Sequence, residues 1–224
     1  MFYLPSIGSR SEIEAGHAGL RPDLYQRMLA ELAEQARLGD RLGYHSVNFT
    51  EHHFHIEGFE LSNNPVLLDL FIAMQTERIR VGQLGVVLPA DNPLRVAEDI
   101  AMLDHMSGGR ADAGFARGYQ RRWVDTMAQQ THGVVGVQPH EHDEIDETNR
   151  RAFEECHRIV TSAWTQDLLQ VDEAGLDRAQ DPRRDVAADR AQRHRLPPHG
   201  ARQGVARQAG RVAGDQGRRP VDAR

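Results

Sequence analysis

The densest group of ionisable side chains in this sequence comes directly after a short apolar run. Residues 47–50 read Val-Asn-Phe-Thr, and Glu51, His52, His53 and His55 follow. An imidazole with an ordinary pKa of about 6.5 can accept or donate a proton near neutral pH. The cluster therefore predicts proton-transfer chemistry at the end of a strand.

A metal site is a second interpretation of the same cluster. His53 and His55 are two positions apart, so their side chains would point the same way on an extended segment. Further ligands would be needed, and the ends of the later strands supply only poor ones: Gln83, Leu84, Ala116 and Arg117. We therefore expect no bound metal. A solvated histidine-rich loop stays open as the purely structural alternative.

Arg117 and Gly118 form a second candidate site. A guanidinium can bind a phosphate or another anion through two parallel hydrogen bonds, and a neighbouring glycine lets the ligand approach the backbone. The alternative is a structural arginine that pairs with a carboxylate such as Asp99 or Asp104. The residues alone leave both interpretations open.

Both candidate sites must be positioned by alternating strands and helices. Apolar runs with β-branched residues predict strands, and apolar residues spaced by about 3.6 positions predict helices. Strands are expected at 2–5, 44–50, 78–88 and 110–116, helices at 23–42, 64–74, 93–106 and 146–164, and loops at 6–19 and 123–143. This alternation favours a parallel sheet, and such sheets carry their chemistry at the carboxyl ends of the strands. Both candidate sites fall at those ends.

The fold class is therefore α/β, built from TIM-barrel-type (β/α) units. Residues 1–167 supply about four strands, whereas a closed (β/α)₈ barrel has eight strands and about 250 residues. Residues 168–224 contain no Phe, Trp, Tyr, Ile or Met, yet hold 12 of the 27 basic residues, all of which are arginine. We expect 1–167 to form the N-terminal half of a barrel and 168–224 to be a disordered or weakly helical tail.

Composition also argues against several kinds of partner. The arginines of 168–224 alternate with Asp and lack aromatic neighbours, so we expect no nucleic-acid binding. No apolar run approaches the length of about 18 residues that spans a bilayer, and no secretory signal is visible. The single cysteine, Cys156, excludes an internal disulfide and lies in a helical pattern that predicts burial. A cytoplasmic protein is the expectation.

In these segments the sequence resembles the bacterial luciferase-like flavin monooxygenase family. The resemblance covers about residues 2–167, and its specificity comes from several motifs that occur together in the same order. The matching segments are 49–54, 86–89, 92–99, 101–110 and 114–118. The resemblance implies a (β/α)₈ barrel that binds FMN, or in some members a deazaflavin coenzyme, at the carboxyl face of its strands.

The resemblance also implies roles for individual residues. His52 would lie beside the reactive edge of the flavin and assist proton transfer, with Glu51 on the cofactor side of the site. Leu84 and Gly85 would be joined by a non-prolyl cis peptide bond against the flavin ring. These assignments follow from position within the matching segments of this sequence.

Arg117 would meet the flavin phosphate, and Gly118 and Tyr119 would line the same side. The implied reaction uses O₂ and reduced flavin, supplied by a flavin reductase, to oxygenate a small organic substrate in a homo- or heterodimer. One alternative is a deazaflavin-dependent oxidoreductase that transfers hydride without oxygen. Another is a non-catalytic barrel fragment, oligomeric or marginally stable because the edge of its fourth strand is unpaired.

Overall fold

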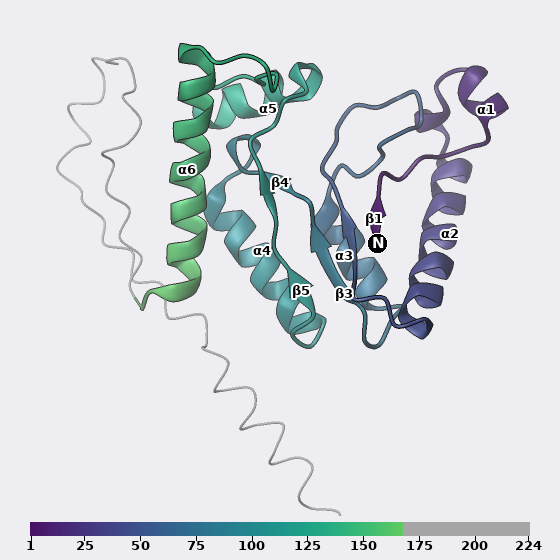
Figure 1. The fold of residues 1–224 in the computed structure, drawn as a ribbon. Coiled ribbons are helices and arrows are strands. Elements are labelled where there is room, and N and C mark those ends of the chain that lie inside the picture. The colour runs from purple at the N-terminus through teal and green to yellow at the C-terminus, as the bar shows by residue number, and fades with distance from the viewer. Residues whose placement is uncertain (168–224) are drawn as a thin grey trace, which may run out of the picture.

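Short parallel strands form the centre of the molecule (Figure 1). The computed structural model describes residues 1–167, so the expected tail at 168–224 lies outside the described residues. One parallel sheet has the order β1-β2-β3-β5, and a second parallel pair joins β4 to β6. The strands are β1 (Phe2–Tyr3), β2 (Ser46–Phe49), β3 (Arg80–Gln83), β4 (Val86–Val87), β5 (Ala111–Asp112) and β6 (Phe115–Ala116). The prediction of four parallel (β/α) units is confirmed.

Two of the four predicted strands are each divided in two. The run predicted at 78–88 forms β3 and β4, and the run predicted at 110–116 forms β5 and β6. The breaks lie side by side at Gly85 and Gly114. A Cβ on Gly85 would lie 2.6 Å from the carbonyl carbon of Phe115, and one on Gly114 would overlap the carbonyl oxygen of Gln83. Only glycine permits backbones to approach this closely, so these two positions keep the strands adjacent across the break.

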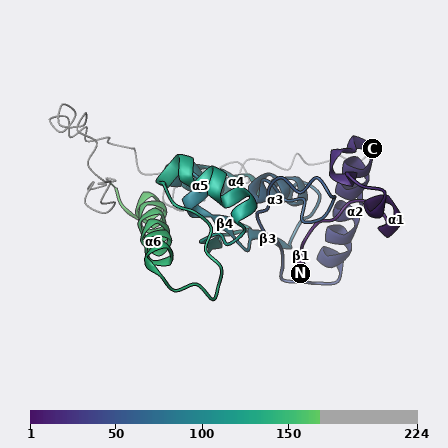
Figure 2. The ribbon, with the colours of Figure 1, turned by 90° about the horizontal axis from the view of Figure 1, so that it is seen from above.

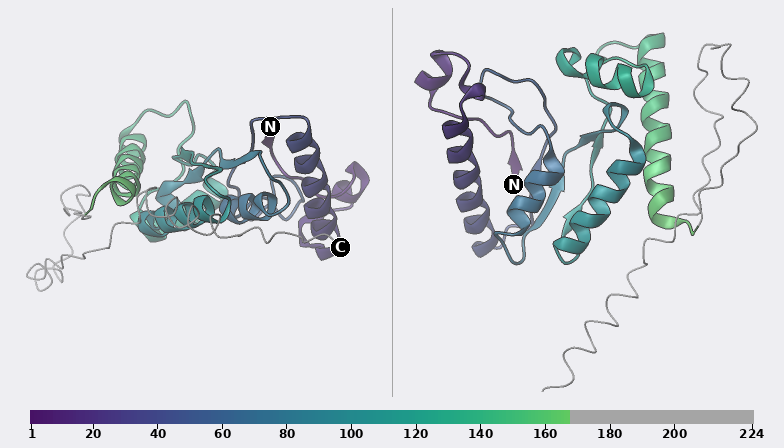
Figure 3. Two further views of the ribbon diagram at one scale, coloured as in Figure 1. Left: turned by 90° about the horizontal axis from the view of Figure 1, so that it is seen from below. Right: turned by 180° about the vertical axis from the view of Figure 1, so that it is seen from behind.

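Four helices surround the sheet. They are α2 (Pro22–Arg41), α3 (Pro65–Ala73), α4 (Pro93–Met106) and α6 (Glu144–Thr165). Helices α3 and α4 lie along one face of the sheet, with α2 at one end and α6 at the other (Figure 2, Figure 3). Asn64 and Asn92 start α3 and α4 by accepting backbone hydrogen bonds, and a proline follows each of them. Both signals favour a helix start, which explains why these two boundaries could be predicted.

Two predicted loops are wrong in part. The loop expected at 123–143 begins with helix α5 (Arg121–His132), whose buried residues Trp123, Val124 and Ala128 pack inward. The loop expected at 6–19 contains helix α1 (Arg10–Glu14), which Ser9 and Glu12 start by capping each other's backbone. It is followed by the 3₁₀ turn η1 (Ala18–Leu20), and another such turn, η2 (Leu88–Ala90), follows β4. Polar composition hid the helical spacing of α5, and α1 is too short to show any.

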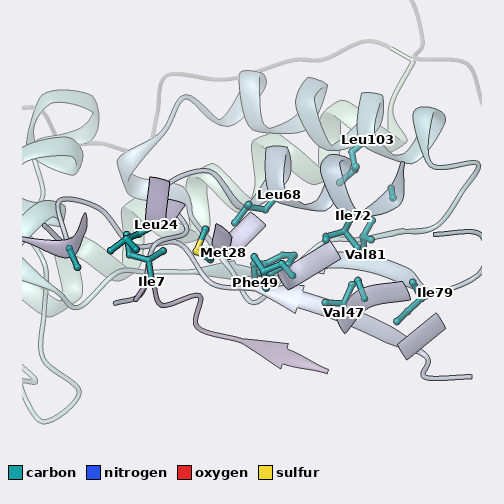
Figure 4. Close-up of a cluster of buried hydrophobic side chains, with 14 residues drawn as sticks. Ile7, Leu24, Met28, Val47, Phe49, Leu68, Ile72, Ile79, Val81 and Leu103 are labelled. Carbon is teal, nitrogen blue, oxygen red and sulfur yellow. The ribbon is translucent and has the colours of Figure 1, made fainter. Parts of the chain in front are cut away.

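The largest hydrophobic cluster joins α2, α3 and the middle of the sheet (Figure 4). Phe49 and Val81 from β2 and β3 are fully buried in it, and Ile72 of α3 packs against them. A second cluster lies between α4 and α6, where Cys156 is 1% exposed, as predicted. Burial raises the pKa of the Cys156 thiol to about 12. No helix within residues 1–167 is both long and apolar enough to cross a membrane.

Asp40 ties the end of α2 to the start of β3. Its carboxylate accepts backbone hydrogen bonds from Glu77 at 2.8 Å, Arg78 at 3.1 Å and Ile79 at 2.8 Å. Burial alone would raise the pKa of Asp40, but these three N–H donors outweigh it and hold the pKa below its usual range. The ionised carboxylate therefore stabilises the connection that sets where β3 begins.

We predict that Asp40→Ala lowers the free energy of unfolding by about 3 kcal/mol, because it leaves buried N–H donors without an acceptor. A depressed folded pKa adds stability above the unfolded pKa and loses it as the pH falls. The difference from wild type should therefore shrink below pH 3.8, the ordinary value for this group. Urea unfolding of the full chain would measure both effects, with Glu34→Ala on the exposed face of α2 as the control. An equal loss in both variants would contradict the prediction.

Candidate functional site

A cavity of about 230 Å³ opens at the carboxyl ends of all four predicted strands. The lining begins after β1 with Leu4, continues after β2 with His52, and includes the segments that follow β3 and β6. Its other lining residues are Thr50, Glu51, Glu60, Leu84, Gly85, Val87, Ala116, Gly118, Tyr119, Gln120 and Trp123. Seven site residues were predicted, and six of them line this cavity: Glu51, His52, Leu84, Gly85, Gly118 and Tyr119.

The His52 side chain is buried and held by Gln120. Its Nδ1 lies 3.3 Å from Oε1 of Gln120, and the Trp123 indole donates to the same oxygen at 3.1 Å. An indole N–H can only donate, so it fixes which end of the Gln120 amide is the oxygen. His52 must then carry its proton on Nδ1. Within residues 1–167 its Nε2 has no hydrogen-bond partner, and that nitrogen is left for chemistry in the cavity.

Burial lowers the pKa of His52. The hydrogen bond that His52 donates to Gln120 and the charge of Glu60 oppose this effect without overcoming it. A lowered pKa keeps the imidazole neutral near neutral pH, where it can accept a proton. The proton-transfer role predicted for this cluster is therefore chemically available at His52.

Glu60 lines the polar side of the cavity, and His55 is buried behind it. Nδ1 of His55 lies 3.4 Å from Oε2 of Glu60, and its Nε2 lies 3.2 Å from Oε1 of Gln120. His53 points elsewhere, with its Nε2 2.8 Å from Oε1 of Glu51. The expectation that His53 and His55 point the same way is therefore wrong. Phe54 between them has a φ of 62°, so the segment is not extended.

Glu51 joins two strand ends rather than facing solvent. Its Oε2 accepts the backbone N–H of Val87 at 2.7 Å, and its Oε1 contacts His53. The carboxylate therefore links the end of β2 to β4. The peptide bond between Leu84 and Gly85, which lies just before β4, is cis, as the resemblance implied. This bond and the side chain of Glu51 line the same cavity.

Arg117 lies outside the cavity lining. Its Nη1 is 2.8 Å from Oδ1 of Asp146 on α6, and the arginine side chain is 37% exposed. Arg117 pairs with a carboxylate, as the structural alternative predicted, but the partner is Asp146 and not Asp99 or Asp104. The remaining exposed part of the guanidinium could still meet an anion, so the phosphate role of Arg117 stays a prediction.

Sequence reasoning missed three residues that organise the site. Gln120 lies just before α5, and Trp123 lies in its first turn, where the predicted loop was expected to begin. Glu60 lies in an irregular segment after His55. The apolar spacing of Trp123, Val124 and Ala128 could have revealed α5 and so placed Gln120 at its start. No periodic signal marks Glu60.

A second cavity of about 240 Å³ lies on the other side of Glu51. Its lining includes Glu51, His53, Asp91 and Asp99. Burial raises the pKa of Asp91 to about 6, with a further contribution from the negative charge of Glu51. Glu51 thus separates a largely apolar cavity from an acidic one.

A model of the luciferase-like monooxygenase family matches residues 13–213, which is most of the chain. The chain belongs to this family. The match continues beyond residue 167, where the sequence resemblance was expected to end.

Named relatives of this luciferase-like chain match over part of their own length. The alkanal monooxygenase alpha chain of Photorhabdus laumondii is 28% identical over 146 residues, which is 65% of this chain and 36% of the relative. The oxygenase component of the flavin-dependent trigonelline monooxygenase of Acinetobacter baylyi is 36% identical over 93 residues, or 42% of this chain and 25% of the relative. The chain therefore spans about a quarter to a third of the length of these relatives.

Solved structures of luciferase-like proteins share the fold. Monooxygenase RslO1 from Streptomyces bottropensis has a TM-score of 0.53 at 28% identity, over 66% of this chain and 41% of that one. The oxygenating constituent of 3,6-diketocamphane monooxygenase from Pseudomonas putida, in complex with FMN, has a TM-score of 0.53 at 22% identity, over 67% and 39%. An F420-dependent secondary alcohol dehydrogenase has a TM-score of 0.50 at 16% identity, over 66% of this chain and 42% of that one. The last two likenesses concern the fold alone.

For this luciferase-like chain we predict that Asp91→Asn stabilises the protein near pH 8 and has little effect near pH 3.5. A raised folded pKa adds stability below the unfolded pKa of 3.8 and loses it as the pH rises through about 6. The gain at high pH should be on the order of 1–3 kcal/mol, since one pKa unit corresponds to about 1.4 kcal/mol.

Urea unfolding at the two pH values would measure this effect. Asp99→Asn is the matched control, because it removes the same charge from the lining of the same cavity. A gain for Asp91→Asn that does not change with pH would contradict the assignment of the raised pKa to Asp91.

Proposed function

We propose that this chain carries the flavin-edge side of a flavin-dependent monooxygenase site, which uses O₂ to oxygenate a small organic substrate. The observation that carries the proposal is the cavity itself, whose lining holds a buried His52 of lowered pKa together with Leu84, Gly85 and Gly118. Membership of the luciferase-like family supports the reaction class.

The lining suits a flat ring on one side. Gly85 and Gly118 contribute backbone to the lining, and a Cβ on Gly118 would meet Val87 and Val124, so this glycine lets the chain pack closely behind the cavity wall. Leu84 and Trp123 add apolar surface. At about 230 Å³ the cavity is smaller than the range of about 300–1,000 Å³ that is typical of small-molecule sites. Residues 1–167 therefore fit one part of a flavin, with the rest of the site supplied from elsewhere.

A bound reduced flavin supplies the electrons for the reaction with O₂. The residues of this chain bind and orient it and move one proton. Gln120 and Trp123 hold the His52 proton on Nδ1, so that Nε2 can accept or return a proton at the cavity face. The apolar part of the lining excludes water, which protects reactive species from side reactions.

FMN is the proposed coenzyme. The flavin-dependent relative from Acinetobacter and the fold shared with an FMN complex support it. The fold shared with an F420-dependent enzyme keeps a deazaflavin-dependent oxidoreductase as the second candidate. Arg117, with Gly118 and Tyr119 beside it, is the proposed contact for the anionic end of the coenzyme. A reductase that supplies reduced flavin is proposed because the Acinetobacter relative is an oxygenase component, and a dimer is proposed with it.

Titration of the full chain with FMN and with F420, each followed by fluorescence, tests the choice of coenzyme. We expect saturable binding of FMN at a stoichiometry near one and no saturation by F420. The reverse result would favour the deazaflavin enzyme. Binding of neither coenzyme would favour the non-catalytic barrel fragment.

We predict that His52→Ala lowers flavin-dependent oxygenation by about a hundredfold or more, the usual contribution of a positioned acid or base. The dissociation constant of FMN should change little, because His52 contacts the reacting edge rather than the anionic end. Single-turnover oxidation of reduced FMN and an FMN titration would separate the two effects. Gln120→Leu should give part of the loss, since it frees the His52 ring. A variant that loses FMN binding and turnover equally would contradict the role.

Arg117→Ala should have the opposite effect and weaken FMN binding by about tenfold or more, the value of one charge-assisted hydrogen bond. Asp146→Asn separates this role from a structural one, because it removes the ion-pair partner and leaves the arginine free for the phosphate. FMN affinity should then be kept or increased. Arg122→Ala, which breaks the exposed ion pair with Glu57, is the control. Equal FMN affinity in wild type and Arg117→Ala would remove the phosphate role.

A further inference from the structure

Three side chains, two of which line the cavity, come together as a set of possible metal ligands. The ligand atoms of His52, His55 and Glu60 all lie within 4.8 Å of one another. Both histidine side chains are more than nine-tenths buried, and the Glu60 side chain is 23% exposed. Sequence analysis had set a metal aside after weighing His53 with His55. The fold brings together a different triad.

The separations suit a small transition-metal ion. Oε2 of Glu60 lies 3.7 Å from Nδ1 of His52 and 3.4 Å from Nδ1 of His55. In a tetrahedral zinc site with bonds of about 2.0–2.2 Å, neighbouring ligand atoms are about 3.3–3.6 Å apart. The two separations from Glu60 are therefore close to those of a shared ion, and the donors of His52 and His55 lie within 4.8 Å of each other.

His55 supplies an independent sign that something is missing from this site. Its Nδ1 is buried and has no hydrogen-bond partner within residues 1–167, although it faces the carboxylate of Glu60. A buried nitrogen without a partner is costly, and a ligand at this point would satisfy it. Since Nε2 of His55 lies 3.2 Å from the oxygen of Gln120, that nitrogen carries the proton and Nδ1 presents its lone pair.

We infer that His52, His55 and Glu60 form a binding site for a divalent transition-metal cation of the Zn²⁺ type. Two neutral imidazoles and one carboxylate give the site a net charge of −1, which attracts a cation. Two histidines and a glutamate with an open fourth position are a donor set found in zinc enzymes. His52 and Glu60 line the cavity, so the fourth position faces it and can hold water.

Metal binding would change the hydrogen bonding of His52. The ion would replace the proton on Nδ1 and end the hydrogen bond to Gln120, which would keep its bond from Trp123. Bound metal and the arrangement proposed for proton transfer therefore exclude each other at one nitrogen. The test of metal binding does not depend on the proposed function, because it is carried out without flavin.

The test is competition for Zn²⁺ between the full chain and a chromogenic chelator, in the absence of flavin. Wild type should bind Zn²⁺ with a dissociation constant in the micromolar range or below. His55→Gln and Glu60→Gln should each weaken this site by about tenfold or more, because each removes one of three ligands. His53→Gln is the matched control, since that imidazole pairs with Glu51 and lies outside the triad.

Because other histidines of the chain could also bind Zn²⁺, the variants decide whether the ion is bound at this site. Zn²⁺ binding that is unchanged in both His55→Gln and Glu60→Gln would place the ion elsewhere and overturn the inference. So would the absence of binding in wild type, or an equal loss in His53→Gln. Thermal unfolding without metal checks that each variant folds. If His55→Gln does not fold, Glu60→Gln alone decides, because its partly exposed side chain can be replaced without opening the core.

Discussion

The carboxylate of Glu51 holds two neighbouring strand ends together at the rim of the site. It accepts the backbone N–H of Val87 through one oxygen and contacts His53 through the other. Strands β3 and β4 belong to different sheets and are separated by a break. The pairing of β3 with β2 and β5 therefore does not by itself fix where the segment after the break lies. The buried hydrogen bond from Val87 to Glu51 helps to hold this segment, together with the one from the Leu84 N–H to the Phe49 carbonyl at 2.7 Å, and Leu84 and Gly85 line the cavity with His52. Burial raises the pKa of Asp91 behind it, and the negative charge of Glu51 adds to this effect.

The groups proposed to act in the cavity come from different strand ends, and none of them is positioned by its own strand alone. His52 follows β2, but its ring orientation depends on Gln120 and Trp123 at the start of α5. Preorganisation of this kind means that proton-transfer geometry is set before any ligand arrives. The same convergence also brings His55 and Glu60 within reach of one ion.

Periodicity and strand-end position were enough to predict the parallel sheet, four of the helices and the place of His52. They were enough because apolar spacing and the Asn-Pro helix starts are local signals. Glu60 could not be predicted, since its position depends on left-handed backbone at Phe54 and at Glu60 itself, which no side-chain pattern there requires. The pairing of Arg117 with Asp146 depends on how α6 packs, which is a tertiary property. The disorder expected for 168–224 stays a prediction.

Cys156 is the only thiol of the chain, and it is sealed between α4 and α6 beside His132, whose Nε2 lies 3.4 Å from its sulfur. With a pKa of about 12 it is almost entirely protonated in this position, and a protonated thiol reacts poorly with alkylating reagents. Alkylation of Cys156 therefore requires α6 to detach from α4. The rate of alkylation therefore measures how often α6 detaches from α4, and it reports the local stability of this helix separately from global unfolding.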